Sequence, residues 1–84
     1  MTHTLTNEEI AVRLRRHAAE LASRGENLYR VRAFRQAALT VMGLNQPIAE
    51  LGSEGLLQIK GIGESLAETL GQFAKTGEWK PRTP

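Results

Sequence analysis

The segment whose residues most clearly indicate a binding function spans residues 56–70, where a short apolar run is followed by a Gly-x-Gly turn at Gly61 and Gly63. After the turn, apolar residues recur at Leu66, Ala67 and Leu70 with the spacing of a helix. The segment therefore predicts a helix, a tight hairpin and a second helix. The two glycines allow backbone angles that a side chain would forbid, and they leave the chain open to close approach by a ligand.

The main-chain amides at the start of that second helix are the predicted anion-binding groups. The first amides of a helix lack intrahelical acceptors, and the positive end of the helix dipole lies among them. Such a terminus can hold a phosphate group. The candidate donors are the amides of Gly61, Gly63, Glu64 and Ser65. The alternative interpretation is an ordinary turn between helices, with glycines present only for close packing.

The order of residues in the turn resembles the helix-hairpin-helix motif, which binds the DNA backbone without reading its sequence. The resemblance rests on Ile59, Gly61, Ile62 and Gly63, followed by Leu66 and Ala67. It implies that the hairpin contacts DNA, and the candidate DNA-binding residues there are Lys60, Gly61, Ile62, Gly63, Glu64 and Ser65.

A wider pattern, over roughly residues 6–80, is similar to the amino-terminal domain of family X DNA polymerases of the polymerase beta type. It consists of Gly-Glu-Asn at 25–27, Tyr-Arg-Val-Arg-Ala-Phe-Arg-Gln-Ala-Ala at 29–38, the hairpin, Phe73 and Thr76-Gly77. The resemblance implies a helical domain that binds the 5′ side of gapped DNA. It places Tyr29 where a ring can stack on a template base and Arg30 against a 5′-phosphate. Arg32 and Arg35 are the further candidate contacts.

Some members of that family also remove a 5′-deoxyribose phosphate through a lysine Schiff base. The resemblance places that lysine at Thr69, and a threonine hydroxyl cannot form an imine. Lys60 and Lys75 are the alternative amines. The chain also has no aspartate, so it lacks the metal-binding carboxylates of the polymerase catalytic domain. We therefore expect no catalytic residue, although a lyase that uses another lysine stays an alternative.

The same resemblance implies a monovalent cation, Na⁺ or K⁺, at the hairpin. Its ligands would be the main-chain carbonyls of Leu57, Ile59 and Ile62, and carbonyl oxygens suit such a hard ion. No cofactor is required for backbone binding.

Composition limits the other classes of function. The chain has 84 residues, no cysteine, two histidines and a net charge of +2, so disulfides, thiolate metal sites and His-rich metal sites are excluded. No apolar run reaches the length of a membrane span, and a cytoplasmic location is the expectation. We also expect a monomer. Arginines concentrate in the first half, where seven fall between Arg13 and Arg35.

The remaining patterns predict helices only, in an all-α bundle of four to five short helices that contains one helix-hairpin-helix motif. Thr6 and Glu9 form a capping box. The helix that follows carries an apolar stripe and ends near Gly25; the stripe consists of Ile10, Leu14, Ala18 and Leu21. Asn27 caps a second helix from Leu28 to about Met42, whose predicted buried face consists of Leu28, Val31, Phe34, Ala38 and Val41.

The second half predicts three shorter pieces. Pro47 opens a short helix through Leu51, and Ser53 caps the first arm of the hairpin, residues 53–57. The last helix runs from Glu64 to about Lys75, before Gly77. Trp79 is expected to fold back as an apolar plug. We expect one DNA-binding domain over residues 1–80, with 81–84 as a frayed tail or the start of a linker.

The preferred function is DNA binding without sequence specificity, at gapped or nicked duplex or at single-stranded DNA, in repair or replication. A deoxyribose-phosphate lyase and a protein-interaction adaptor are the alternatives. For the arginines, the alternative to phosphate contacts is salt bridges with Glu20 and Glu26 on a solvated face.

Overall fold

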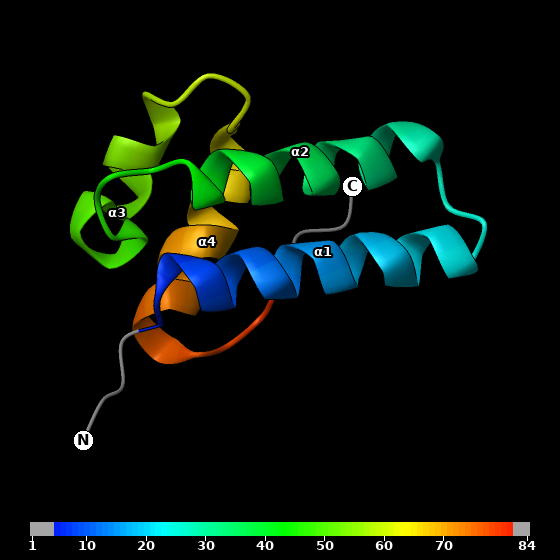
Figure 1. The fold of residues 1–84 in the computed structure, drawn as a ribbon, viewed down its shortest axis with the longest axis horizontal. Helices are drawn as coiled ribbons and strands as arrows, with labels where there is room; N and C mark the ends of the chain where they lie inside the picture. The colour runs from blue at the N-terminus through cyan, green and yellow to red at the C-terminus, as the bar shows by residue number, and fades with distance from the viewer. Residues whose placement is uncertain (1–4, 82–84) are drawn as a thin grey trace.

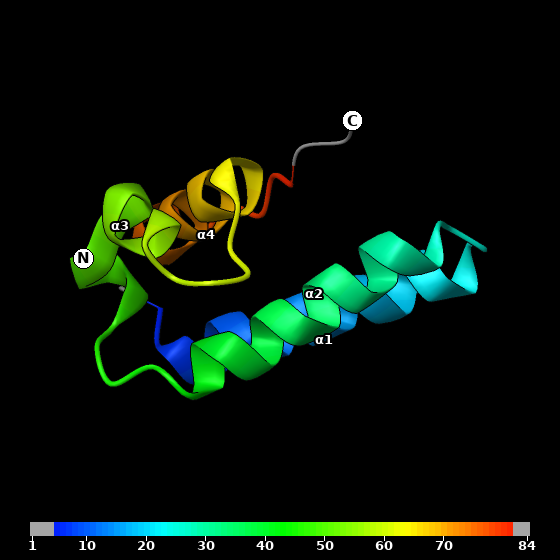
Figure 2. The ribbon, with the colours of Figure 1, turned by 90° about the horizontal axis from the view of Figure 1, so that it is seen from above.

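Four helices make up the computed structural model, which describes residues 5–81: α1 (Asn7–Ser23), α2 (Leu28–Met42), α3 (Ile48–Leu57) and α4 (Glu64–Thr76). The chain folds as two antiparallel helix pairs, α1 with α2 and α3 with α4 (Figures 1 and 2). No strand occurs within residues 5–81, so the predicted all-α bundle is confirmed. None of the helices in this range has the length and apolar character needed to cross a bilayer. Most of the predicted tail, residues 82–84, lies outside the described part.

The first helix begins at the predicted capping box. The Thr6 hydroxyl accepts a hydrogen bond from the Glu9 amide at 3.1 Å, and the Glu9 carboxylate accepts one from the Thr6 amide at 2.9 Å. The predicted stripe is buried throughout, and the helix ends two residues before Gly25, whose φ of 74° is left-handed. Local chemistry therefore determines both ends of α1.

The second helix also has the predicted bounds, but the predicted burial is wrong for one residue of its core face. The Asn27 side chain accepts from the Tyr29 amide at 2.7 Å, and the helix ends at Met42. Leu28 was expected inside and is 69% exposed. At about 100° per residue it lies roughly 120° around the helix from Phe34, so it points away from α1.

The third helix joins two segments that the sequence predicted separately. Gly52 has φ 68° and ψ 179°, which bends α3 between the short helix and the first arm of the hairpin. The amide of Ile48, at the start of α3, donates to the Asn7 side chain on α1 at 2.9 Å. The Ser53 hydroxyl caps no amide within residues 5–81, so its predicted cap is wrong.

The core joins the two helix pairs through large apolar side chains that are fully buried. They come from all four helices and include Leu14, Val41, Ile48, Leu56 and Leu70. The last helix ends at Thr76, and the Gly77 amide donates to the Phe73 carbonyl at 2.9 Å with a left-handed φ of 79°. Trp79 then packs against this core, as predicted.

Candidate nucleic-acid interface

The hairpin between α3 and α4 is built from a left-handed glycine and a buried isoleucine. Gly61 has φ 95°, a conformation that glycine adopts without steric cost. The Ile62 side chain is 5% exposed and belongs to the core, and its amide donates to the Ile59 carbonyl at 3.1 Å. Ile62 therefore anchors the turn and offers a ligand neither its side chain nor its amide.

Around that anchor, the main-chain amides have no acceptor. The first hydrogen bond of α4 runs from the Ala67 amide to the Gly63 carbonyl at 2.9 Å, and Gly63 supplies no side-chain cap. Within residues 5–81, no group accepts from the amides of Lys60, Gly61, Gly63, Glu64, Ser65 or Leu66. All of these residues except Leu66, which is half-buried, are exposed.

The free amides include the four donors predicted from the sequence. They also include the amides of Lys60 and Leu66, which were not predicted as donors. A helix whose cap is glycine leaves its first amides without a side-chain acceptor, and that feature could have identified the Leu66 amide. The structure thus brings several unpaired donors to one exposed helix start, where the helix dipole also favours an anion.

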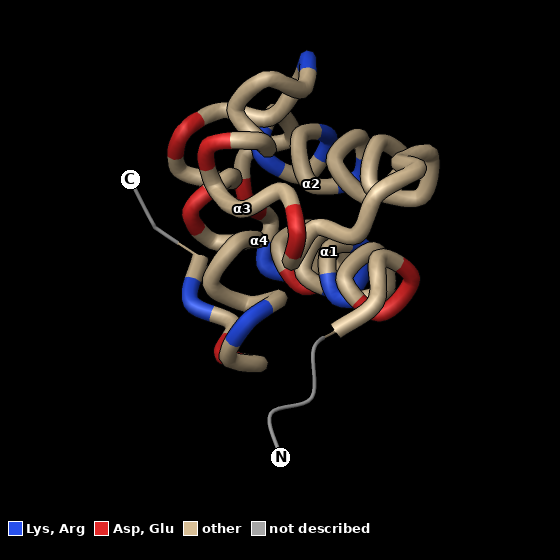
Figure 3. Tube along the Cα trace, turned by 90° about the vertical axis from the view of Figure 1, so that its left-hand side faces the viewer, with Lys and Arg blue, Asp and Glu red and all other residues tan. Residues whose placement is uncertain are grey.

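The charges of the hairpin itself oppose each other. Lys60 and Glu64 are both exposed, and Glu64 occupies the first turn of α4. A carboxylate there stabilises the helix through its dipole but repels an incoming phosphate. Figure 3 shows the wider distribution, with mainly acidic positions along α3 and α4, both signs along α1, and basic positions only along α2. Binding at the hairpin therefore depends on the amides more than on net charge.

The three carbonyls named for a monovalent cation lie at the end of α3 and in the turn. The Ile59 carbonyl already accepts from Ile62, whereas those of Leu57 and Ile62 accept no hydrogen bond within residues 5–81. The donor set is therefore compatible with Na⁺ or K⁺, because even the occupied carbonyl keeps a second lone pair. No group of His, Cys, Asp and Glu side chains in the described residues could hold a metal ion.

The arginines of α2 differ in their partners. Arg30 is half-buried and lies 3.6 Å from the Glu26 carboxylate. Arg32 and Arg35 are exposed, and no carboxylate of residues 5–81 pairs with either. Tyr29 is 82% exposed, which leaves its ring open to stacking. The salt-bridge interpretation thus holds for Arg30, whereas Arg32 and Arg35 are available to contact a phosphate.

The hairpin and the first turn of α2 form separate patches. Figures 1 and 2 place the hairpin beside the half of α2 that ends at Met42. Tyr29 and Arg30 lie in the first turn of α2, at its opposite end. A ligand that contacts both patches must therefore run along α2.

The position that the polymerase resemblance gives to a Schiff-base lysine holds no amine. Thr69 is 6% exposed, and its hydroxyl donates to the Ser65 carbonyl at 2.9 Å. Lys75 lies in the last turn of the same helix, and Lys60 lies in the hairpin. The environment of Thr69 is that of a packed helical residue.

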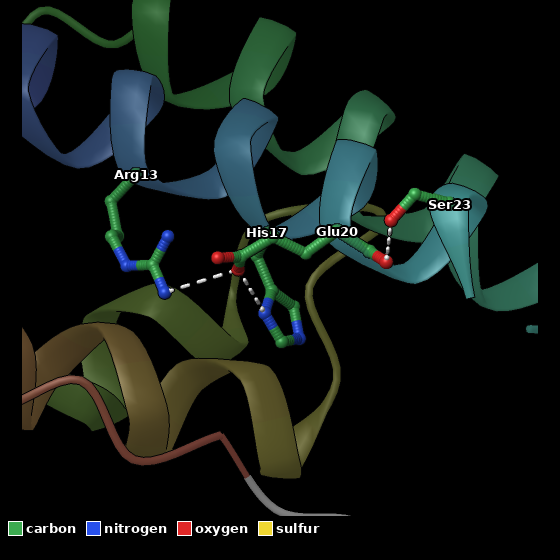
Figure 4. A network of polar contacts seen from close by, with 4 residues as sticks. All are labelled: Arg13, His17, Glu20 and Ser23. Carbon is green, nitrogen blue, oxygen red and sulfur yellow. Dashed lines mark hydrogen bonds and ion pairs between the residues drawn. The ribbon is translucent and has the colours of Figure 1, made fainter.

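A polar cluster against Trp79 was not predicted. Figure 4 shows Arg13, His17 and Glu20 on one side of α1, where Glu20 lies 3.4 Å from Arg13 and 3.6 Å from His17. The His17 ring is 5.4 Å from the Trp79 ring, and the Arg13 guanidinium lies 4.8 Å over that ring. The sequence predicted a salt bridge to Glu20 and the return of Trp79 separately. Their contact was missed because it forms only when the C-terminal segment reaches α1.

The pKa of His17 lies below its ordinary value of 6.5, first because burial disfavours the charged ring and then because Arg13 is nearby. Glu20 acts in the opposite direction but does not reverse the shift. The unfolded chain therefore binds a proton at higher pH than the folded one, and stability falls as the pH drops below 6.5.

We expect His17→Gln to flatten that dependence. Urea unfolding at pH 7.5 and again at pH 5.5 should show a smaller loss of stability in the variant than in the parent protein. His3→Gln, outside the described residues, is the matched control. Equal losses in the parent and in His17→Gln would contradict the assignment.

The geometry agrees with what comparison with known proteins finds. The helix-hairpin-helix domain family matches residues 5–79, which is nearly the whole chain, so the chain belongs to this family. Helix-hairpin-helix domains commonly bind DNA, and membership therefore indicates DNA binding for this chain. No curated protein and no solved structure gave a significant match.

Proposed function

We propose that this protein binds the phosphate backbone of gapped or nicked DNA that carries a 5′-phosphate, without reading base sequence, in DNA repair or replication. The observation that carries the proposal is the row of unpaired amides at the start of α4, on an exposed turn in a helix-hairpin-helix domain. Amides contact phosphate oxygens, which are the same at every base pair, so they position a protein without giving sequence specificity.

The side chains of α2 extend the proposed contact. In this proposal Arg30 contacts the 5′-phosphate, and Arg32 and Arg35 contact neighbouring phosphates. Tyr29 stacks on an unpaired template base. The exposure of Tyr29 and the guanidinium groups of Arg32 and Arg35, which have no carboxylate partner within residues 5–81, support these roles, whereas Arg30 would have to exchange Glu26 for the phosphate. A gap provides both a terminal phosphate and unstacked bases, and a continuous duplex provides neither. We further propose that the protein acts as a cytoplasmic monomer, with Na⁺ or K⁺ at the hairpin carbonyls.

Fluorescence polarisation with labelled DNA tests this proposal. We expect the tightest binding to a gapped duplex with a 5′-phosphate, weaker binding to the same gap with a 5′-hydroxyl, and the weakest binding to intact duplex. Neutralising phosphates with Lys60 and the three arginines should make log K fall with log salt at a slope of about −3 to −4.

Two results would contradict the proposal. One is an affinity that differs between gapped duplexes of unrelated sequence. The other is an affinity that does not change with salt.

A further inference from the structure

The outer face of α2 carries two arginines between apolar side chains, at the spacing of a coiled-coil seam. Leu28, Arg32, Arg35, Leu39 and Met42 follow one another at intervals of four, three, four and three residues, and we call this row the α2 seam. All five residues are exposed, with Leu28 at 69%, Leu39 at 68% and Met42 at 51%. Because these side chains are exposed, none of the described helices covers this side of α2.

A groove runs beside the seam. It has a volume of about 460 Å³ and is lined by Tyr29, Arg32, Ala33, Arg35, Gln36 and Leu39. Large apolar side chains gathered on one exposed face are typical of a protein-binding surface, and methionine adapts easily to a partner's shape. A phosphate backbone offers no apolar group to Leu28, Leu39 or Met42, so DNA alone does not account for this face.

Charge indicates what the partner must be. The α2 sequence contains three arginines and no acidic residue, and Arg32 and Arg35 have no carboxylate partner within residues 5–81. In a parallel pair of two copies, each of these arginines would face its own counterpart. In an antiparallel pair centred on the seam, Arg35 would still face Arg35. Like charges directly opposed disfavour a second copy of this chain.

We propose that the α2 seam binds an amphipathic helix of another protein, with apolar residues at both ends of its contact stripe and two carboxylates at the centre. The carboxylates would pair with Arg32 and Arg35, and the apolar residues would pack on Leu28, Leu39 and Met42. An arginine guanidinium forms two-point hydrogen bonds with a carboxylate, which fixes the register of such a pairing. The proposal does not depend on DNA binding at the hairpin, but it uses Arg32 and Arg35, which the proposed function assigns to phosphates, so the helix and DNA would compete for these two arginines.

A pair of synthetic helical peptides tests the register directly. The first has leucines facing Leu28, Leu39 and Met42, glutamates facing Arg32 and Arg35, and two lysines on its outer side. The second has the same composition with the glutamates and the lysines exchanged, so the two peptides differ only in which charge meets the seam. We expect the first to bind at least about tenfold more tightly, measured by fluorescence polarisation.

Variants of the protein complete the test. Leu39→Ala should lower the affinity for the first peptide. Val12 is an exposed apolar residue of α1, and Val12→Ala should leave that affinity unchanged. Arg35→Glu should abolish the preference, because each peptide then meets one opposite and one like charge, and the double variant Arg32→Glu, Arg35→Glu should reverse it in favour of the lysine peptide. Circular dichroism shows whether each variant is folded, and all of these positions are exposed. Leu39→Ala should leave the affinity for gapped DNA unchanged, and Glu64→Pro in the hairpin should leave the affinity for the peptide unchanged.

Three outcomes would overturn the proposal. One is equal binding of the two peptides. Another is a loss of DNA affinity but not of peptide affinity in Leu39→Ala, which would assign the face to DNA. The third is concentration-dependent self-association in sedimentation that Leu39→Ala abolishes, which would assign the face to a second copy.

Discussion

Glu64→Pro should weaken binding of a 5′-phosphorylated gapped duplex at least about tenfold relative to Glu64→Ala, because one hydrogen bond to a charged phosphate is worth about 1.5–3 kcal/mol. Proline lacks the amide proton that we assign to the phosphate, and alanine keeps it. The site accepts proline well, since Glu64 is the first residue of α4 and the preceding Gly63 is extended, with φ −87° and ψ 178°.

Glu64→Ala is the matched control, because both variants remove the same carboxylate. We expect Glu64→Ala itself to bind slightly more tightly than the parent protein, since a negative charge beside the phosphate is lost. Polarisation titrations of the three proteins, with circular dichroism to confirm the fold, measure both effects. Equal affinities of the proline and alanine variants would mean that the Glu64 amide does not contact DNA.

Trp79→Ala should lower the free energy of unfolding by about 3 kcal/mol, a large part of the total for a domain of this size. Its ring lies 5.2 Å from the Phe73 ring on α4, and on α1 it contacts His17 and Arg13. The side chain therefore holds the two helix pairs together from outside the helices. Urea unfolding followed by circular dichroism measures the loss.

Tyr29→Ala is the control for this prediction. Tyr29 is aromatic but 82% exposed, so its removal should change stability by less than about 0.5 kcal/mol. The same substitution should weaken binding to gapped DNA if the ring stacks on a template base. Losses of stability that match in the two variants would show that Trp79 is not part of the core.

The helices could be predicted from the sequence because their ends depend on neighbouring residues. Thr6 and Glu9 are three residues apart, Asn27 caps an amide two residues away, and Gly77 directly follows α4. The free amides of the hairpin could also be predicted from neighbouring residues, since they lack an acceptor whenever a turn flanked by glycines starts a helix. These features need no knowledge of tertiary structure.

The contacts that escaped prediction join residues far apart in the chain. The Asn7 side chain holds the start of α3, 41 residues away, by accepting from the Ile48 amide. Trp79 meets His17 only because the C-terminal segment returns to α1. Leu28 was misplaced because an apolar residue in the first turn of a helix need not share the buried face. Periodicity gives no information about which elements meet.

The central claim is that the bare amides at the start of α4 bind a DNA phosphate. The most direct test is an ¹H–¹⁵N NMR titration with 5′-phosphorylated gapped duplex at two salt concentrations. We predict that the amide signals of Gly61, Gly63, Glu64 and Ser65 shift at both concentrations, with weaker affinity at the higher one, while Ile62, whose amide is already bonded to Ile59, shifts less. Hairpin signals that stay unmoved while the DNA binds would contradict the account.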